Sequence, residues 1–540
     1  MATNSNINNR QYDSFALFLD RVGTVIETSQ ISFLGYSSDG VARRCKQAIY
    51  AREWRNYYRN FDLVTEQSQI TISIERNTIR VRPWVVWLGT AKFLHHWFRI
   101  CYSILRTLGS HPNGEWNNRA FTVLQCFGSE YLINREDLFL EFCKSKQIFA
   151  LDSDTCTLLV YGRFPEGPSE NRRFFRSNQA LETILRINPP TSTIEFLLLL
   201  SLHVRSLISF ITMLQSFPLI CLMYEDFSLH ALMEYLNMRN LISWWIIDNS
   251  ALLQQPLPVT NLLRRKFKTG IVFYSINNRV HVLSDKYCEA VLLCWRYLAL
   301  DIGWAWNLDQ AEWLRNNTRI SSILVTGPML YRLPPTSHAT NPKQSLTFDI
   351  LIFDNTIASA EHYAELYGKH SPQYPDGEMA ISFLDDIVES VAAARRVSSA
   401  YEIRMRLKVK RLRLTKTTVW QVLLPYQTRN SRDNLDSEYQ TIVSKYLSSG
   451  TFGNVEAGAD LYALLGACNL VISIPYTSIN FMADQIGVPS VYYDPTGRLV
   501  NSFVMQKNMQ FVQGYSALVQ YLRTALADWA SVDNQLSMLP

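Results

Sequence analysis

The stretch DLYALLGACNLVISIPYTSINFMADQIGVPSVYYDPTG, residues 460–497, decides the fold of the second half of this chain. Its apolar pattern predicts a helix over 460–467, a strand over 470–474, a helix over 479–486 and a strand over 490–493. Short, continuously apolar strands that alternate with helices are typical of a parallel sheet with helices on its faces. The stretch therefore predicts an α/β domain.

The turn between the first of these strands and the following helix is Pro475-Tyr476-Thr477-Ser478. Ligands of open parallel sheets bind beyond the carboxyl ends of the strands, and the free N–H groups at a helix N-terminus attract anions. We therefore expect this turn to bind a phosphate or a carboxylate. The alternative is that Thr477 or Ser478 only caps the helix, as Ser and Thr often do.

The same alternation extends outward from this stretch in both directions. Apolar runs predict strands at 156–161, 219–224, 242–247, 270–275, 323–327, 348–353 and 419–424. Helical patterns lie between them at 196–214, 228–237, 309–316, 382–397 and 435–447, with a last helix at 516–527. The leading region to about residue 150 is mixed, with a strand pattern at 70–81 and a helical pattern at 51–60.

These patterns predict an α/β fold with two Rossmann-like domains. A chain of 540 residues exceeds the size of one hydrophobic core, which favours two domains. We place an N-terminal domain at 1–320 and a C-terminal domain at 321–515. A C-terminal helix at 516–540 is a candidate to cross back onto the first domain.

Composition excludes several classes of protein. The formal net charge is only +5, which does not indicate a nucleic-acid partner. Nine scattered cysteines without C-x-x-C spacing indicate reduced thiols rather than a disulfide framework or a zinc site. The polar N-terminus MATNSNINNRQYDSF lacks the apolar core of a secretory signal. We therefore expect a cytoplasmic protein.

Two apolar segments raise the question of a membrane. The run 196–224 is nearly long enough to span a bilayer, but His203, Arg205 and Gln215 interrupt it and Pro218 splits it. We interpret 196–214 as a buried helix, with a spanning helix as the alternative. The segment 84–108 mixes apolar with basic residues, which is compatible with an ordinary helix or with an interfacial helix on the inner face of the cytoplasmic membrane.

The turn and its neighbours resemble a bacterial polysaccharide biosynthesis family that is named for a Pro-Phe-Thr-Ser motif, with Tyr476 in place of Phe. The flanking residues 471–473 and 487–495 also fit that pattern, and the strong resemblance covers about 453–498. Weaker similarity lies at 224–226, 274–278 and 323–328. The resemblance implies the architecture called GT-B, in which two Rossmann-like domains face a central cleft. It also implies sugar transfer in the synthesis of surface or capsular polysaccharide.

The resemblance also implies roles for several residues. By analogy with transferases for Kdo and sialic acid, Thr477 and Ser478 would hold a nucleotide phosphate, which favours a CMP-sugar donor. UDP- and GDP-sugars remain alternatives. No D-x-D pair ends a strand, since Asp152–Asp154 precedes one, so we expect no metal and no cofactor. The partners would be a nucleotide-sugar donor and a glycan or lipid-linked acceptor.

Further donor-site candidates follow other strands. The ring of Tyr493 is placed to stack on a base or ribose, and Asp494 to accept from a ribose hydroxyl; the alternatives are core packing and a turn cap. Gly327 would let the backbone approach the donor, although a glycine at a strand end often marks only a turn. Gly453 lies in a loop that we expect to face the nucleotide.

The acceptor side would belong to the first domain. Glu225 and Asp226 follow the predicted strand 219–224, where one carboxylate is placed to serve as the general base of an inverting transfer. The alternative is a cap on the next helix. Polar residues after the next two strands would bind acceptor hydroxyls, namely Asn249, Ser250, Ser275 and Asn277.

One cluster of basic residues has more than one interpretation. The basic run 404–416 predicts either an edge strand or an amphipathic helix end. Its cations would face a donor phosphate, an anionic lipid-linked acceptor, the membrane surface or only solvent.

The rivals to a glycosyltransferase are a nucleotide-sugar epimerase, a non-catalytic scaffold protein of the polysaccharide machinery, and a peripheral membrane protein.

Overall fold

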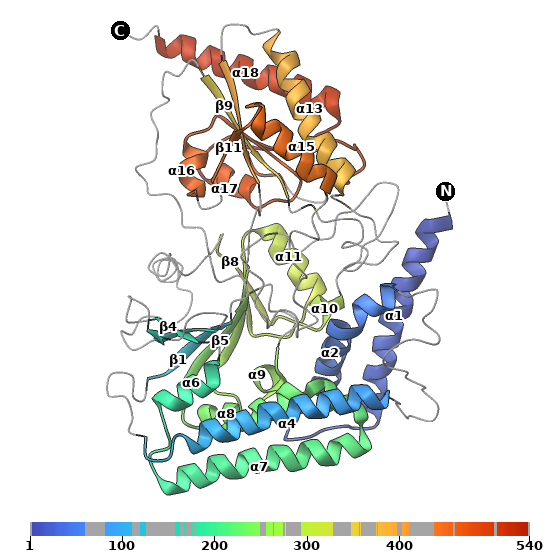
Figure 1. The fold of residues 1–540 in the computed structure, drawn as a ribbon, viewed down its shortest axis with the longest axis vertical. Helices are drawn as coiled ribbons and strands as arrows, with labels where there is room; N and C mark the ends of the chain where they lie inside the picture. Colours follow the sequence, from blue (N-terminus) through green and yellow to red (C-terminus); the bar gives the residue numbers. More distant parts are fainter. Residues whose placement is uncertain are drawn as a thin grey trace. The chain divides into compact units, whose positions relative to one another are not determined.

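The computed structural model confirms an α/β fold with two parallel sheets, each in its own compact unit (Figure 1). The N-terminal unit comprises residues 10–274 and 290–332, and the C-terminal unit comprises 333–540 together with 1–9 and 275–289. The structure describes residues 3–59, 81–110, 119–125, 157–161, 167–168, 174–177, 179–248, 255–262, 264–273, 276, 293–327, 347–355, 357, 374, 376–396, 402–409, 437–456, 459–501 and 505–537.

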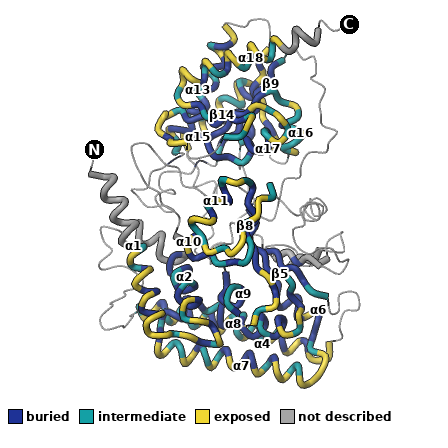
Figure 2. Tube along the Cα trace, turned by 180° about the vertical axis from the view of Figure 1, so that it is seen from behind, coloured by how far each residue is buried: buried dark blue, intermediate teal, exposed yellow. Residues whose placement is uncertain are grey.

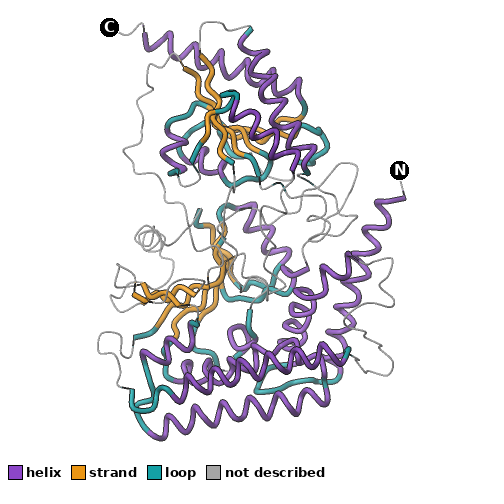
Figure 3. The backbone as a smooth tube through the Cα atoms, in the orientation of Figure 1, coloured by secondary structure: helices purple, strands orange, loops and turns teal. Residues whose placement is uncertain are grey.

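In the described part of the N-terminal unit, eight strands form one sheet in the order β3-β4-β2-β1-β5-β6-β7-β8 (Figure 3). All neighbouring pairs run parallel except β3 with β4. The strands are β1 (Phe121–Gln125), β2 (Thr157–Tyr161), β3 (Gly167–Pro168), β4 (Phe174–Ser177), β5 (Ile242–Asp248), β6 (Lys268–Val272), β7 (Ile302–Ala305) and β8 (Ser322–Val325). The predicted strands at 156–161 and 242–247 are confirmed, and the one at 270–275 is found as β6.

The helices of the N-terminal unit include two long apolar ones. They are α1 (Thr3–Thr28), α2 (Ser38–Arg59), α4 (Pro83–Leu105), α6 (Ala180–Ile187), α7 (Thr193–Ser216), α8 (Tyr224–Met238), α9 (Leu257–Asn261), α10 (Leu293–Arg296) and α11 (Leu308–Asn317). α7 begins at the N-cap Ser192, because Ser192 Oγ accepts from the Glu195 N–H, while Glu195 Oε2 accepts from the Thr191 N–H. The predicted helix at 196–214 is therefore confirmed, and its start is explained.

The predicted strand at 219–224 is wrong. Pro218–Met223 forms a 3-10 helix, η3, and Tyr224 continues directly into α8. Five consecutive residues of η3 are buried because α2, α4, α7 and α8 all pack around it. A short apolar run that is buried on all sides has the same composition as a buried strand, so periodicity alone does not separate the two.

The C-terminal unit holds a second sheet, in which each described pair of neighbouring strands runs parallel. Its strand order is β11-β10-β9-β12-β13-β14. The strands are β9 (Thr347–Phe353), β10 (Glu402–Lys408), β11 (Gly453–Asn454), β12 (Leu470–Ser473), β13 (Ser490–Asp494) and β14 (Met509–Gln513). Their apolar side chains are almost fully buried, as Figure 2 shows for the centre of this unit.

Helices cover this second sheet. They are α13 (Gly377–Arg395), α15 (Ser437–Ser448), α16 (Leu461–Gly466), α17 (Ile479–Gln485) and α18 (Tyr515–Ser537). Asp376 and Asp460 cap α13 and α16 by accepting from backbone N–H groups three residues on. α18 packs on α13 and β14 of its own unit, and the crossing back to the first domain stays a prediction.

The boundary between the units lies later than predicted. The apolar run at 323–327 is a strand, as expected, but it is β8 and pairs with β7 of the N-terminal sheet. The second sheet begins only at Thr347, and the units divide at Leu333 rather than near residue 320. The predicted strand at 419–424 lies outside the described residues. The predicted strand at 70–81 also lies outside them, except for residue 81.

Candidate functional site

The strand order of the C-terminal sheet places the motif turn at a crevice. From β9 the chain adds β10 and β11 on one side, and then returns to add β12, β13 and β14 on the other side. The order therefore reverses between β9 and β12, and open parallel sheets bind ligands beyond the carboxyl ends of the strands at such a switch point. β12 ends at Ser473 beside Phe353, so the turn Pro475–Ser478 leaves the sheet at this crevice.

Tyr476 is held in an uncommon backbone conformation. Its φ is +68°, in the left-handed region that residues with a Cβ rarely adopt. The side chain is 3% exposed, and its hydroxyl donates to the carbonyl oxygen of Val500 at 2.8 Å. The surroundings therefore fix this conformation, and such enforced outliers cluster at ligand sites. The hydroxyl that Phe would lack ties the turn to the segment after β13.

Thr477 holds the turn from within. Its Oγ1 donates to Ser473 Oγ at 2.7 Å, and Ser473 Oγ donates to Asn480 Oδ1 at 2.6 Å. Its carbonyl oxygen accepts from the Tyr492 hydroxyl at 2.5 Å. Thr477 is only 5% exposed, so its hydroxyl is part of a buried network rather than of the surface.

Ser478 is the one motif residue that is not buried. It occupies the N-cap position of α17, but its side chain makes no capping hydrogen bond. The Ile276 N–H donates to Ser478 Oγ at 3.4 Å. α17 has only seven residues, so its helix dipole is a weak reason to expect an anion at this turn. The position of the turn at the switch point is the stronger reason to expect a ligand here.

Tyr493 and Asp494 lie on the next strand, β13, with side chains that are already engaged. The Tyr493 hydroxyl donates to Asp386 of α13, and its ring lies near Phe383. Burial and Asp386 raise the pKa of this phenol well above its usual value. These contacts match the core-packing alternative; a stacking role for Tyr493 stays a prediction.

The Asp494 carboxylate organises the segment after β13. Oδ1 accepts from Tyr374, from the Thr496 N–H and from the Thr496 hydroxyl, at 3.2, 3.0 and 2.7 Å. Oδ2 accepts from the Leu499 N–H at 2.8 Å and from Gln513 at 3.1 Å. Five donors of the chain therefore surround a fully buried carboxylate, which matches the turn-cap alternative. Its predicted contact with a ribose remains untested.

Two residues at the crevice were not among the predicted donor residues. Asp354 follows β9 directly and is buried, and its Oδ2 accepts from the Tyr439 hydroxyl at 2.7 Å. Lys408 ends β10 beside Phe353, and its Nζ donates to the carbonyl oxygen of Glu456 at 2.9 Å. Burial lowers the pKa of Lys408. A polar residue directly after an apolar strand was the signal for Asp354.

The structure describes the first part of the basic run at 404–416. Residues 404–408 belong to β10, which lies between β9 and β11, so neither an edge strand nor a helix end is correct for them. Arg404 and Arg406 both pair with Asp349 of β9. Two of the cations of the run therefore share one carboxylate within the sheet, and Lys408 is the one at its carboxyl edge. Residues 410–416 lie outside the described part.

The two predicted glycines lie apart from each other. Gly453 is exposed in β11, next to Arg406, three strands away from the motif turn. Gly327 has φ +87° and follows β8 of the N-terminal unit, so it does not share a sheet with the motif as predicted. Its positive φ explains why glycine stands there.

Glu225 and Asp226 were predicted to supply a catalytic base because they were expected to follow a strand, and the structure does not place them there. Both lie in the first turn of α8 rather than after a strand. Asp226 is fully buried, forms a two-oxygen ion pair with Arg44 at 3.1 and 3.0 Å, and accepts from the Leu257 N–H. Glu225 accepts from the Tyr224 hydroxyl at 3.0 Å. Asp226 thus joins α8 to α2 and α9, and the predicted catalytic role has no support from its position.

The predicted acceptor-side residues Asn249, Ser250, Ser275 and Asn277 lie outside the described residues. Within the parts of the chain that are described, no group of three or more His, Cys, Asp or Glu side chains is arranged to hold a metal ion. Metal-independent chemistry stays a prediction.

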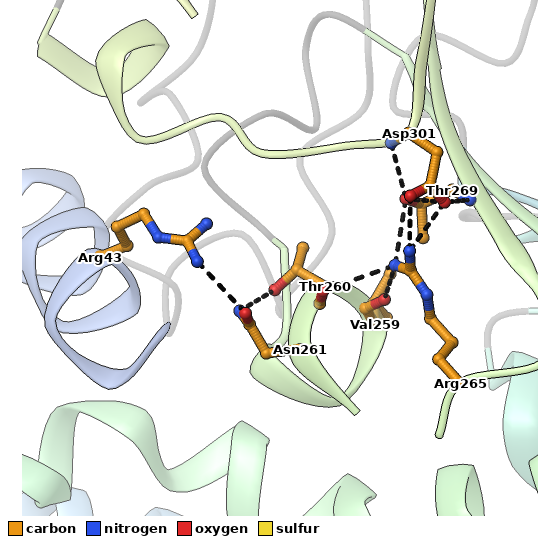
Figure 4. A network of polar contacts seen from close by, with 7 residues as sticks. All are labelled: Arg43, Val259, Thr260, Asn261, Arg265, Thr269 and Asp301. Atoms are coloured by element: carbon orange, nitrogen blue, oxygen red, sulfur yellow. Dashed lines mark hydrogen bonds and ion pairs between the residues drawn. The ribbon is translucent and has the colours of Figure 1, made fainter. Parts of the chain in front are cut away.

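A dense polar network in the N-terminal unit lies at the amino ends of strands β6 and β7 (Figure 4). Arg265 donates to both carboxylate oxygens of Asp301 at 2.6 and 2.7 Å, and Asp301 also accepts from the Thr269 N–H at 2.7 Å. Asp301 immediately precedes β7 and Thr269 lies near the start of β6. These contacts fasten the amino ends of two strands, which is a structural task rather than a ligand site.

A family model described as "Polysaccharide biosynthesis PFTS motif protein" matches residues 205–522, more than half of the chain. None of the curated proteins compared with the sequence matches it.

Solved structures with similar folds include the wall teichoic acid polymerase TagF, at 12% identity and a TM-score of 0.38, covering 83% of this chain and 90% of that one. UDP-GlcNAc 2-epimerase from Neisseria meningitidis is 12% identical with a TM-score of 0.35, covering 77% and 92%. The glycotransferase of kitacinnamycin is 11% identical with a TM-score of 0.33, covering 78% and 93%.

Proposed function

Because this chain belongs to the polysaccharide biosynthesis PFTS motif family, we propose that it is a glycosyltransferase that moves a sugar from a nucleotide donor to a glycan or lipid-linked acceptor. The observation that carries the proposal is the position of the motif turn at the switch point of the C-terminal sheet. The transfer takes place in the cytoplasm, where nucleotide-activated sugars are made. The coarser role, a protein of polysaccharide biosynthesis, follows from the family itself.

The donor's phosphate would lie between Ser478 and Lys408. Ser478 is the accessible member of the motif, while Tyr476 and Thr477 hold its backbone in place. Lys408 lies at the same carboxyl edge, on the strand next to β9. A hydroxyl and an ammonium group supply hydrogen-bond donors and positive charge to an anion. We therefore assign phosphate binding to these two side chains.

This arrangement suits the charge that develops during transfer. The bond between the anomeric carbon and the phosphate oxygen breaks, and negative charge grows on the departing nucleotide. Fixed donors at that phosphate stabilise the transition state more than the ground state. The acceptor hydroxyl forms the new glycosidic bond and gives its proton to a base.

Ligand-induced stabilisation tests the donor site. Purified protein is heated with CMP, UDP, GDP or their sugar conjugates, with CMP-sugars as the first candidates. Ser478→Ala and Lys408→Met should each weaken the response to one nucleotide class by about tenfold in affinity, the loss expected for one charge-assisted contact. Lys445→Met is the matched control, because Lys445 is an exposed residue of α15.

Each outcome separates the proposal from its rivals. Donor consumption that requires an added acceptor supports a transferase, whereas conversion of the nucleotide sugar without an acceptor indicates an epimerase. A folded protein that responds to no nucleotide contradicts the donor site and favours the scaffold role.

A further inference from the structure

α4 presents a long apolar stripe to solvent. Its exposed large side chains recur at the spacing of one helix face, at Trp84, Trp87, Leu94, Phe98, Tyr102 and Leu105. Trp87 is 71% exposed and Phe98 is 62% exposed, although both are among the most apolar side chains. The opposite face of the helix is the buried one, at Val85, Gly89, Phe93, Ile100 and Ile104. The outward stripe contains no charged side chain.

α7 shows the same arrangement, which corrects the prediction of a buried helix. Its exposed large apolar side chains are Ile194, Leu197, Leu198, Val204, Ile208 and Ile211, again on one face. The buried face is Leu199, Leu202, His203, Ser206 and Phe210. Exposed polar residues such as Ser201, Thr212 and Gln215 lie among them, and Arg205 is the one exposed residue of α7 that is charged.

The two stripes belong to one surface. Phe93 stacks on Phe210 and Trp97 stacks on His203, so the helices run antiparallel side by side. Both pack their buried faces on η3 and α8, and both outward faces therefore point away from that layer. Figures 1 and 2 show the pair at the end of the N-terminal unit opposite its sheet, with exposed stretches along α7. We call the outward stripes of α4 and α7 the apolar face.

Basic residues outnumber acidic ones beside the apolar face. Between Glu75 and Glu115 the sequence holds no Asp or Glu, but it holds six Arg or Lys residues, of which Arg82, Lys92 and Arg106 flank or lie within α4. Arg205 adds a further cation on α7. Arg99 pairs with the acid Glu182. The surface therefore combines large apolar side chains with a local excess of basic over acidic residues in the sequence.

We propose that the apolar face docks this protein on a lipid bilayer that contains anionic headgroups. Amphipathic helices with Trp, Phe and Leu on one side and basic residues at the margin lie in the membrane interface, and anionic lipids strengthen their binding. Exposed apolar patches of this extent are rare on proteins that meet only water. The inference does not depend on the proposed transferase activity, since it concerns binding alone.

A second copy of the chain is a poorer occupant than a bilayer. In a symmetric dimer through this face, the same surface meets itself. Its basic residues would then face basic residues, because α4 offers no acid and the acid of α7, Glu195, already accepts from the Thr191 N–H. Anionic headgroups supply the missing opposite charge.

α7 lies on the bilayer rather than across it. Among the described residues, α7 is the one helix long and apolar enough to cross a membrane by length and composition. However, one side of it packs along its length on α8, η3 and α4. α8 carries the buried ion pair of Asp226 with Arg44, and polar groups of this kind do not face lipid. Only the outward stripe is therefore available to the membrane.

Vesicle sedimentation of the full-length protein tests the proposal. We expect the protein to bind vesicles in which about a third of the lipid is phosphatidylglycerol and to bind pure phosphatidylcholine more weakly. The variant Trp87→Ser with Phe98→Ser should weaken binding by about tenfold or more, because two aromatic side chains leave the interface. Leu197→Gln with Ile208→Gln should have a similar effect through α7. These side chains are exposed, so the variants should melt as the wild type does.

Leu308→Ser is the matched control. Leu308 is 74% exposed at the start of α11 in the same unit but outside the apolar face, so its loss should leave vesicle binding unchanged. The proposal is overturned if wild type sediments with neither vesicle, or if the α4 and α7 variants bind as wild type does. A lipid-free dimer that these variants dissociate would also overturn it and assign the face to a second copy.

Discussion

The Tyr492 hydroxyl donates a hydrogen bond to the carbonyl oxygen of Thr477 at 2.5 Å, and both residues are buried. Tyr492 lies in β13, whereas Thr477 lies in the turn after the neighbouring strand β12. The bond therefore fixes the motif turn to the strand beside it. Together with the Tyr476 bond to Val500, it holds the backbone of the turn from two sides.

Removing this hydroxyl should loosen the turn. We expect Tyr492→Phe to lower the free energy of unfolding by about 1–2 kcal/mol, because the buried carbonyl of Thr477 loses a donor. The thermal response to nucleotides should weaken as well. Tyr515→Phe is the control, since Tyr515 is 39% exposed in the same unit. Equal unfolding curves for the two variants would show that the Tyr492 bond contributes nothing to stability.

Restoring the phenylalanine of the family motif gives a second prediction. Tyr476→Phe keeps the ring beside Tyr492 but loses the hydrogen bond to Val500. We expect a loss of about 1 kcal/mol in unfolding free energy and little change in nucleotide affinity. Chemical denaturation and ligand titration measure the two effects separately. A large loss of affinity with unchanged stability would instead assign the hydroxyl to the ligand.

The role of Asp494 can be separated from that of a ribose ligand. Asp494→Asn replaces an acceptor that serves five donors by an amide with one oxygen, so we expect a loss of about 3 kcal/mol in stability. The melting temperature measures this loss. A variant that keeps the wild-type melting temperature but loses nucleotide affinity would support the predicted ribose contact.

The C-terminal unit was largely readable from the sequence. The strands at 348–353, 470–474 and 490–493 are confirmed because continuous apolar runs bounded by turn residues are typical of buried parallel strands. The motif turn was also found at a strand end. The separate tasks of its members were not readable, since burial and hydrogen bonding divide Thr477 from Ser478.

Errors arose where tertiary contacts outweighed local pattern. Residues 219–223 form a 3-10 helix because helices surround them, and Asp226 is buried because Arg44, distant in sequence, neutralises it. β8 was assigned to the wrong unit because an apolar strand carries no information about its sheet partner. The outward face of α7 was interpreted as buried because its apolar residues occupy both sides of the helix.

The packing of α4 on α7 should make stability depend on pH. His203 is fully buried, its Nε2 donates to the Trp97 carbonyl, and its Nδ1 has no hydrogen-bond partner among the described residues. Burial lowers the pKa of His203 to about 4, since a proton on Nδ1 would have no acceptor. The unfolded chain takes up that proton near pH 6.5. The folded state is therefore fully favoured above about pH 6.5 and loses stability as the pH falls toward 4, by about 3 kcal/mol at most.

His203→Gln should remove part of this dependence while keeping a donor for Trp97. We expect the unfolding free energy of the variant to change less between pH 6.5 and 4.5 than that of the wild type. Some dependence should remain, because burial and Arg99 also lower the pKa of His96 to about 4. His95→Gln, at an exposed position of α4, controls for the loss of a histidine. If His203→Gln and wild type lose stability in parallel as the pH falls, protonation of His203 is not what destabilises the fold.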